Sequence, residues 1–305
     1  MTMKDFLLFS GSSNTPLAAE VARILGVELG KVDLTRFADG EVRPWIQEDL
    51  RDKTVFVLQS FSYPMDEHIM EMTLMGDAIR RGAPKTMIAI VPYMGYARQD
   101  KLHRVGEPIS ARVIAKIIEV SKFKEVITVD LHNDAIVGFF QIPVTHISAL
   151  QSIAEELKKM DLHDAVVVSP DVGRVKSARN LASVLNVPLV VMEKERALGK
   201  MDSSEAFEII GKVGETVIII DDMISTGGTI VHAASSLVKA GAKHVIVCAT
   251  HGILAGEAIQ KLDASPINQI LLTNTVLIPK EKNLSKLQEV SVAPLIADAI
   301  SQIVR

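Results

Sequence analysis

The sequence predicts an α/β protein of two tandem units, each a mainly parallel sheet flanked by helices. Two observations predict this fold class. Apolar runs of strand length alternate with helical patterns along the 305 residues, as is typical of parallel sheets. The alternation also repeats after about 160 residues, which indicates two units built on one plan.

The repeat fixes the expected domain boundary. Two pairs of segments share their order of strand, turn and helix: Ser10–Leu29 with Ser169–Leu189, and Lys53–Tyr93 with Glu215–His251. We therefore expect a boundary near Ser148, with domains 1–148 and 149–305. A final helix over Val292–Val304 is expected to return to the body of the fold and pack on the N-terminal domain.

Composition excludes several classes of function. The chain is 48% hydrophobic and 23% charged, and its net charge of −4 comes with no basic tail, so neither nucleic acid nor an anionic membrane is an expected partner. No apolar run approaches about 20 residues, and we expect a soluble protein that is not exported. Cys248, the only cysteine, lies in an apolar run and is expected in the core, which fits a reducing, cytoplasmic setting.

The most informative stretch is Val217–Ile230, with the sequence VIIIDDMISTGGTI. Its first four residues predict a buried parallel strand, and a helical pattern begins near Val231. Between them, the glycines of Thr226–Thr229 allow backbone N–H groups to turn inward, and the threonines add hydroxyl donors. Together with the positive end of the following helix, this loop is suited to a phosphate dianion.

Two carboxylates stand between this strand and this loop. Asp221 and Asp222 would repel a phosphate, but they suit the vicinal hydroxyls of a sugar, or a metal bound to them. The ligand would then combine a phosphate with a polyol, as ribose 5-phosphate does. No Gly-Lys-Ser/Thr follows, which excludes a Walker-type P-loop. The plainer alternative is an acidic strand end before a glycine turn. Gln59 and Ser60 occupy the equivalent place in the first unit, which must have another task.

The string resembles the phosphoribosyl-diphosphate loop shared by phosphoribosyltransferases and ribose-phosphate pyrophosphokinases. The resemblance implies two phosphoribosyltransferase-like units. It also implies that ribose 5-phosphate is bound by Asp221, Asp222, Ser225, Thr226, Gly227, Gly228 and Thr229.

The first unit adds two polar segments. In RFADGE, a purine could stack on Phe37 while Asp39 or Glu41 accepts hydrogen bonds from its exocyclic amine, although a phenylalanine is more often a core residue. GYARQD follows a strand, so it lies where ligand sites of α/β folds gather, and Arg98 could clamp a polyphosphate there. A solvated basic loop is the alternative.

These two strings resemble the ATP-binding segments of ribose-phosphate pyrophosphokinases. The resemblance implies that Phe37, Asp39, Gly40 and Glu41 bind the adenine end of ATP, and that Arg98 and Gln99 bind its sugar and phosphates. In that family the two segments come from different subunits. The resemblance thus implies a dimer-based homo-oligomer, and a hexamer is one option.

The resemblance also supplies metal and catalytic positions. His132, in the pattern DLH…GFF…IPV, and Asp171, in SPDVG, would hold the Mg²⁺ that accompanies ATP. On the residues alone, a histidine at a strand end such as His132 is more often a hydrogen-bonded structural residue than a metal ligand. Lys194 and Arg196 would be the catalytic residues, Arg196 also touching the ribose phosphate; without the resemblance, their charged run would be a solvated loop.

The chain departs from the family pattern at four positions. Ser225 stands where many members have Asp, and Glu195 replaces a basic residue between Lys194 and Arg196. Arg174 replaces the second glycine of the usual DxGG diphosphate loop. Asp49 stands where the phosphate-regulated class has Ser, and its carboxylate should repel an anion there. We therefore expect weak or absent phosphate activation and ADP inhibition.

The implied activity is that of a ribose-phosphate pyrophosphokinase. It would transfer the β,γ-diphosphoryl group of ATP to the anomeric hydroxyl of ribose 5-phosphate, giving 5-phospho-α-D-ribose 1-diphosphate and AMP for nucleotide biosynthesis. Two alternatives stay open on the residues: a phosphoribosyltransferase that consumes this product, and a non-catalytic regulatory homologue.

Overall fold

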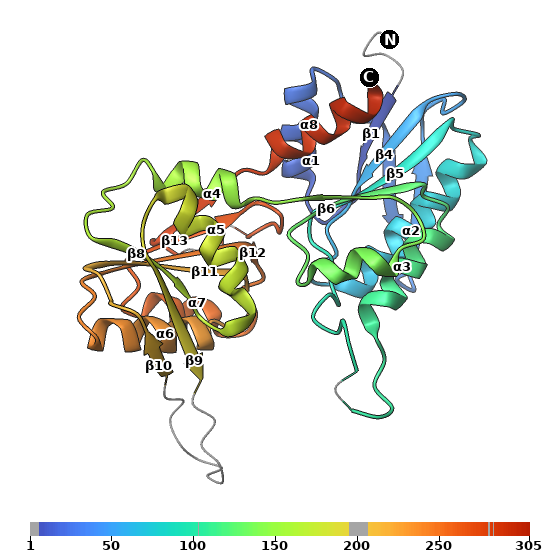
Figure 1. The fold of residues 1–305 in the computed structure, drawn as a ribbon. Coiled ribbons are helices and arrows are strands. Elements are labelled where there is room, and N and C mark those ends of the chain that lie inside the picture. The colour runs from blue at the N-terminus through green and yellow to red at the C-terminus, as the bar shows by residue number, and fades with distance from the viewer. Residues whose placement is uncertain (1–5, 103, 195–206, 280, 283) are drawn as a thin grey trace. The chain divides into compact units, whose positions relative to one another are not determined.

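The chain folds into two compact units (Figure 1). The computed structural model describes residues 6–102, 104–194, 207–279, 281–282 and 284–305. Unit 1 contains Met1–Ser148, Thr275–Leu277 and Ser291–Arg305, and unit 2 contains Ala149–Asn274 and Ile278–Val290. No helix in the described part of the chain has the length and apolar character needed to cross a membrane.

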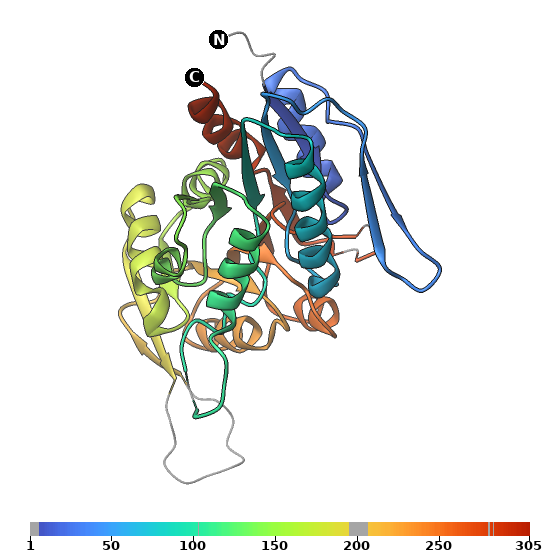
Figure 2. The same ribbon diagram turned by 90° about the vertical axis from the view of Figure 1, so that its right-hand side faces the viewer.

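Unit 1 is built on a five-stranded parallel sheet in the order β1-β4-β5-β6-β7. The strands are β1 (Phe6–Ser10), β4 (Thr54–Leu58), β5 (Thr86–Val91), β6 (Glu125–Val129) and β7 (Val144–Ile147). The helices are α1 (Thr15–Leu25), α2 (Met65–Arg81), α3 (Ser110–Val120) and α8 (Ala293–Val304), with a 3₁₀ turn at Asp134–Phe139. A separate antiparallel hairpin, β2 (Val32–Arg36) and β3 (Val42–Ile46), extends from this body (Figure 2).

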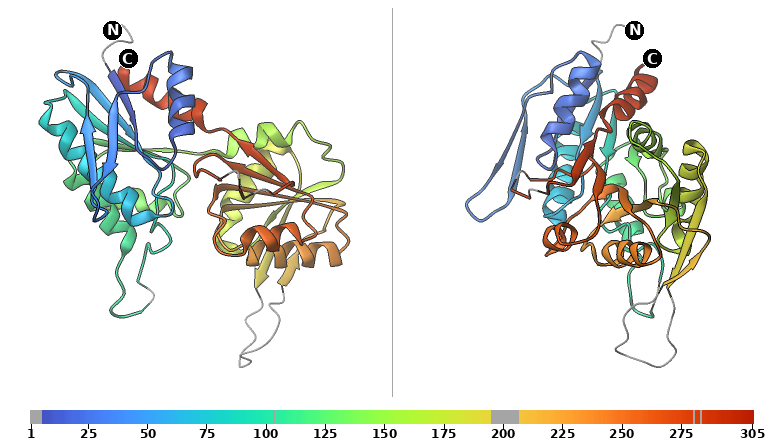
Figure 3. Two further views of the ribbon diagram at one scale, coloured as in Figure 1. Left: turned by 180° about the vertical axis from the view of Figure 1, so that it is seen from behind. Right: turned by 90° about the vertical axis from the view of Figure 1, so that its left-hand side faces the viewer.

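The helices of unit 1 cover both faces of its sheet. Alternate strand residues such as Val55, Val57 and Ala89 pack with the apolar side of α2 and α3, as the two-residue period of a strand requires. On the other face, α8 lies against α1 (Figures 1 and 3). Ser291 Oγ, just before α8, donates a hydrogen bond to Glu20 Oε2 of α1 at 2.8 Å. The C-terminal helix therefore completes the N-terminal unit.

Unit 2 is built on a seven-stranded sheet in the order β10-β9-β8-β11-β12-β13-β14. Only β10 is antiparallel to its neighbour among the pairs described. The strands are β8 (Ala165–Ser169), β9 (Leu189–Lys194), β10 (Phe207–Ile210), β11 (Thr216–Ile224), β12 (His244–Gly252), β13 (Gln269–Thr273) and β14 (Leu287–Val290). The helices are α4 (Leu150–Leu157), α5 (Val175–Leu185), α6 (Gly228–Lys239) and α7 (Ala258–Asp263), with a 3₁₀ turn at Val172–Arg174.

The core of unit 2 also has two layers. Val217 and Ile219 of β11 pack with α6 and α7, whereas Ile218 and Ile220 pack with α4 and α5. A strand buried on both faces needs a continuous apolar run, and this is why Val217–Ile220 has no polar member. Cys248 lies in the second layer and is fully buried, and burial raises the pKa of its thiol. The predicted α/β class, mainly parallel sheets flanked by helices, is confirmed.

Candidate active site

The predicted phosphate loop lies between β11 and α6. The strand is longer than the sequence suggested: β12 pairs with β11 as far as Ile224, so Asp221 and Asp222 lie within the strand and not after it. The helix begins at Gly228, one turn before the predicted start. Gly227 precedes it with a φ of 76°, a left-handed conformation that glycine adopts without strain. The unpaired N–H groups expected in the first turn of α6 therefore adjoin the loop.

The two acids share one cation. Arg174 Nε lies 3.2 Å from Asp221 Oδ1, and Arg174 Nη2 lies 2.9 Å from Asp222 Oδ1. The side chains of Arg174, Asp221 and Asp222 are 15%, 16% and 7% exposed, so the bridge is largely withdrawn from water. The register of β8 with β11 ends at Ile219, and Arg174 reaches the acids just beyond that point.

The environments of the two acids differ from that of an ordinary aspartate. Burial, followed by the negative charge of Asp222, raises the pKa of Asp221 to about 8, and Arg174 acts in the opposite direction. The backbone N–H of Asp222 also donates to Asp221 Oδ1 at 2.8 Å. Even with Arg174 and this N–H beside it, Asp221 therefore keeps its proton to a higher pH than an ordinary aspartate does.

The loop that supplies Arg174 begins with Asp171, one of the predicted metal positions. Asp171 follows β8, and its Oδ1 accepts a hydrogen bond from the backbone N–H of Arg174 at 3.0 Å. Ser169 Oγ donates to the backbone oxygen of Asp171 at 2.7 Å. The structure thus places Asp171, Arg174 and the acid pair at one edge of the unit 2 sheet, the carboxyl end of β8 and β11.

The hairpin of unit 1 carries the predicted adenine site at its tip. A tight turn is closed by the N–H of Phe37 bonding to the oxygen of Glu41 at 2.9 Å, and by the N–H of Gly40 bonding to the oxygen of Phe37 at 2.9 Å. Phe37 is 51% exposed, so the core alternative for this residue is wrong. The guanidinium carbon of Arg43 lies 5.5 Å from the Phe37 ring centre. Asp39 and Glu41 are exposed beside it.

The other ATP segment lies at the carboxyl end of the unit 1 sheet. Arg98 and Gln99 are exposed in the loop after β5, and Gln99 Oε1 accepts a hydrogen bond from Ser110 Oγ at the start of α3. Asp100, the next residue, accepts a hydrogen bond from Asn133 Nδ2 at 2.7 Å. Asn133 adjoins His132, so this bond ties the arginine loop to the predicted metal loop after β6.

His132 sits in that second loop. The backbone turns sharply at Asp130, whose φ is 34°, and the N–H of Leu131 donates to His146 Nε2 at 2.9 Å. These contacts hold the loop at the carboxyl end of β6 and leave His132 half-buried. In the described part of the chain, no three His, Cys, Asp or Glu side chains gather as a metal cluster.

The predicted catalytic lysine is the last residue of β9. The backbone of Lys194 pairs with Phe207 of β10, and β9 runs parallel to β8 with Val191 opposite Ser169. Lys194 therefore ends at the same sheet edge as Asp171 and the acid pair. Arg196 and Glu195 lie outside the described residues.

In unit 1, the place equivalent to the acid pair is filled by the unit's own side chains. Gln59, fully buried, accepts a hydrogen bond from the N–H of Ser13 at 3.0 Å and donates to Glu71 Oε1 at 2.6 Å. Glu71, 3% exposed, also accepts from the N–H and the hydroxyl of Ser12 at 2.7 and 2.8 Å. A Cβ at Gly11 would lie 2.3 Å from Gln59 Oε1. The unit's own side chains thus bond to one another at this position, and the expected other task of the first unit stays a prediction.

Sequence reasoning missed two of these features. In the sequence, Arg174 is only a departure from a glycine pattern, and Glu71 belongs to no motif. The available signal for Arg174 was a single basic residue in the short loop after a strand of the acid-bearing sheet. Of the other departures, Ser225 is half-buried and its backbone oxygen accepts a hydrogen bond from the N–H of Ala255 at 3.0 Å. Asp49 is exposed, and its carboxylate accepts a hydrogen bond from the N–H of Arg51 at 3.2 Å. Weak regulation by phosphate and ADP stays a prediction.

Known proteins resemble this chain over nearly its whole length. Residues 6–121 match the N-terminal domain of ribose phosphate pyrophosphokinase, and residues 200–305 match the phosphoribosyl synthetase-associated domain. The ribose-phosphate pyrophosphokinase of Bacillus caldolyticus is 44% identical over 97% of this chain and 94% of its own. That of Bacillus subtilis is 42% identical over 98% and 94%. The crystal structure of phosphoribosylpyrophosphate synthetase from Mycobacterium smegmatis, 39% identical, has a TM-score of 0.93 and covers 99% of both chains.

Proposed function

The chain belongs to the ribose-phosphate pyrophosphokinase family, and from this premise we propose that it transfers the β,γ-diphosphoryl group of ATP to the anomeric hydroxyl of ribose 5-phosphate. The products are 5-phospho-α-D-ribose 1-diphosphate and AMP. The family relation spans both units, which favours this activity over a phosphoribosyltransferase or a regulatory homologue.

The observation that carries the proposal is the acid pair near the end of β11, which a short loop connects to the N-terminus of α6. Carboxylate oxygens accept hydrogen bonds from vicinal hydroxyls, and a helix N-terminus favours a phosphate. We assign the sugar to Asp221 and Asp222, and the 5-phosphate to the loop Ser225–Thr229. Arg196 is proposed to touch the same phosphate.

ATP is assigned to the exposed polar segments of unit 1. The adenine stacks on the face of Phe37 away from Arg43, beside Asp39, Gly40 and Glu41. Arg98 and Gln99 hold the sugar and the phosphates. In this proposal the anomeric hydroxyl attacks the β-phosphorus in line and AMP leaves, while Lys194 and Arg196 offset the negative charge of the transferring group.

The side chains present fit Mg²⁺ bound mainly through the phosphates of ATP. Mg²⁺ commonly takes one or two protein ligands and fills the rest of its shell with water and phosphate oxygens. Asp171 and His132 would each supply a single ligand, in keeping with the lack of a larger cluster among the described residues. When bound, the ion would neutralise charge on the diphosphate that is transferred.

The test is the formation of AMP. Purified protein is mixed with ATP, Mg²⁺ and ribose 5-phosphate, and AMP is measured by chromatography while the sugar diphosphate is followed by ³¹P NMR. We expect the two products in equal amounts and neither without the sugar phosphate. Formation of ADP in place of AMP, or no sugar diphosphate, would contradict the proposal.

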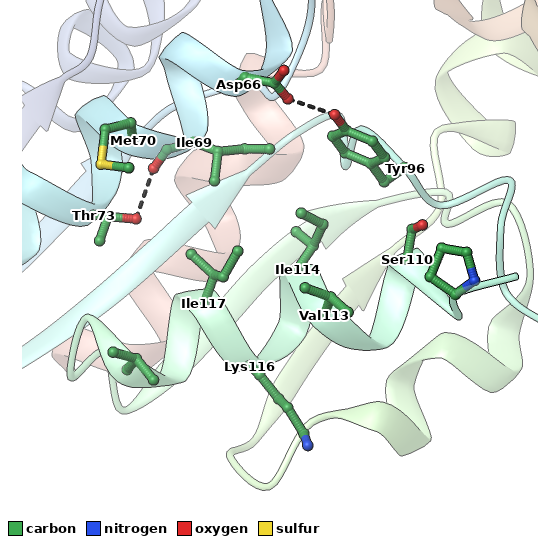
Figure 4. Close-up of a pocket in the computed structure, with 12 residues that line it drawn as sticks. Asp66, Ile69, Met70, Thr73, Tyr96, Ser110, Val113, Ile114, Lys116 and Ile117 are labelled. Atoms are coloured by element: carbon green, nitrogen blue, oxygen red, sulfur yellow. Dashed lines mark hydrogen bonds between the residues drawn. The ribbon is translucent and has the colours of Figure 1, made fainter. Parts of the chain in front are cut away.

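The protein is further proposed to act as a dimer-based homo-oligomer with a shared ATP site. An apolar groove of 640 Å³ in unit 1 supports an oligomer (Figure 4). It lies between α2 and α3, where Met70, Val113 and Val120 are at least half exposed. Such exposed apolar patches are typical of interaction sites. We also propose a cytoplasmic location, which suits a chain whose one cysteine, Cys248, is a buried free thiol.

Replacing Phe37 with alanine should raise KM for ATP about 5- to 100-fold, because one stacked base contributes about 1–3 kcal/mol. KM for ribose 5-phosphate should stay unchanged. Steady-state kinetics of AMP formation provide the measurement. Trp45→Ala is the matched control, since Trp45 is also an aromatic residue more than half exposed on the same hairpin, but it lies away from the tip.

Mixing variants tests whether the ATP site is shared. Phe37→Ala and Arg98→Ala proteins, each impaired alone, should regain activity when unfolded and refolded together. In a 1:1 mixture about a quarter of shared sites would combine an intact Phe37 with an intact Arg98. Mixtures no more active than the average of the two variants would place both residues in one subunit's site.

A further inference from the structure

One buried arginine links the two loops at the ribose end of the proposed site. Arg174 belongs to the segment that follows β8, and it reaches across to β11, where it bridges Asp221 at 3.2 Å and Asp222 at 2.9 Å. Its backbone N–H is held in turn by Asp171 Oδ1 at 3.0 Å. Arg174 is therefore held at both ends, its backbone by Asp171 and its guanidinium by the two acids.

The geometry of the strand makes this bridge unusual. Successive side chains of a strand point to opposite faces, so Asp221 and Asp222 would not ordinarily meet one partner. Pairing of β8 with β11 ends at Ile219, which leaves that edge of β11 open beside the two acids. A guanidinium at this edge can reach side chains on both faces of the sheet. A planar fork with five N–H donors is suited to this task, whereas an ammonium is a single point charge.

The bridge also opposes the electrostatic tendency of the site. Two adjacent carboxylates in a largely buried setting repel each other, and each would favour its protonated form. Burial and Asp222 act on Asp221 in that direction, and Arg174 acts against them. Removing the cation would leave the pair with fewer acceptor oxygens and a less defined orientation toward a diol.

We propose that Arg174 is a positioning residue for the sugar: by bridging Asp221 and Asp222 it holds both carboxylates in place as acceptors for the vicinal hydroxyls of ribose 5-phosphate. This inference rests on the proposed function. It separates Arg174 from residues that bind the diphosphate of ATP, because its contacts in the structure are with the ribose acids.

The test compares Arg174→Gln with the unaltered protein in AMP formation. KM for ribose 5-phosphate should rise about 10- to 100-fold, as expected for loss of hydrogen bonds to charged groups, while KM for ATP changes less than about 3-fold. Arg174→Lys should fall between the two, since it keeps the charge but not the fork. Circular dichroism and thermal melting verify that each variant is folded.

A second variant covers the case in which Arg174→Gln does not fold. In Arg174→Gly, millimolar ethylguanidinium should lower KM for ribose 5-phosphate toward the parent value, and sodium chloride at equal ionic strength should not. Arg179→Gln is the matched control, because Arg179 is an exposed arginine on α5, the helix that follows this loop. It should leave both KM values unchanged.

Two results would overturn the inference. One is a folded Arg174→Gln protein with an unchanged KM for ribose 5-phosphate. The other is a parallel rise in KM for ATP, which would make Arg174 a diphosphate ligand. Failure of the proposed function looks different, because the unaltered protein would then form no AMP at all.

Discussion

Replacing Lys194 with alanine should lower turnover about 10²- to 10³-fold, the usual loss when one group that stabilises a developing charge is removed. Lys194 ends β9 at the sheet edge shared with Asp171 and the acid pair. In the proposed mechanism, this lysine offsets the charge of the diphosphoryl group during its transfer. The affinity for ribose 5-phosphate should be nearly unchanged, because the acids and the loop after β11 are untouched. AMP formation gives turnover, and titration calorimetry gives the affinity.

The control for this variant is Lys212→Ala. Lys212 is exposed in the turn after β10. Its replacement removes the same charge from the same pair of strands, but away from the sheet edge where Asp171 and the acid pair lie. Turnover of Lys194→Ala within about twofold of the parent would remove the catalytic assignment. Loss of ribose 5-phosphate affinity in parallel with turnover would make Lys194 a binding residue instead.

The fold was predictable because its signals are local. Strands buried on both faces need continuous apolar runs, and Val217–Ile220 and Ala165–Val168 have them. The final helix was expected over Val292–Val304 and occupies Ala293–Val304. The helix that it packs against was harder to infer, because α8 contacts α1, which lies near the opposite end of the sequence. An apolar helix face shows that a partner is needed but does not identify it.

The prediction that the strand ends before Asp221 and Asp222 is wrong for a physical reason. Aspartates are rare in strands, so two in succession indicate that a strand has ended. Here pairing of Asp221 with Ala249, and of Met223 with His251, continues the ladder past them. Hydrogen bonds to a long neighbouring strand outweigh the weak local preference. The continuation of β11 therefore follows from the length of β12 beside it, and that pairing is a property of the fold.

The same limit applies to Arg174. The sequence showed an arginine where a glycine was expected, and it gave no partner. In the described part of the chain, α5, β9 and β10 lie between Arg174 and its partners in sequence. The contact depends on where the register between β8 and β11 stops. Side-chain bridges of this kind follow from tertiary register, which no local pattern encodes.

Replacing Asp222 with asparagine should raise KM for ribose 5-phosphate about 10- to 100-fold and lower the free energy of unfolding by about 1.5–3 kcal/mol. Asp222 is 7% exposed and lies 2.9 Å from Arg174. An amide in its place offers the guanidinium no charge and the sugar one acceptor fewer. Urea unfolding at pH 7 measures the loss. Asp263→Asn, at the exposed end of α7, should change neither quantity.

Asp221→Asn should weaken ribose 5-phosphate binding to a similar degree, but its effect on stability should depend on pH. The pKa of Asp221 is raised from its ordinary 3.8 to about 8. Between these values the folded protein keeps a proton that the unfolded chain releases, so the stability that this group contributes is full below the lower value and is lost as pH rises through the upper one. Asparagine does not titrate and therefore escapes that loss.

The difference in unfolding free energy between Asp221→Asn and the parent should accordingly move in favour of the variant from pH 5 to pH 8.5. The same comparison for Asp263→Asn should show no such drift, because Asp263 is exposed at the end of α7 and lies away from the acid pair. Urea unfolding at the two pH values tests this. Parallel curves for Asp221→Asn and the parent would mean that Arg174 alone keeps both acids ionised, and the acid pair would then enter the reaction fully charged.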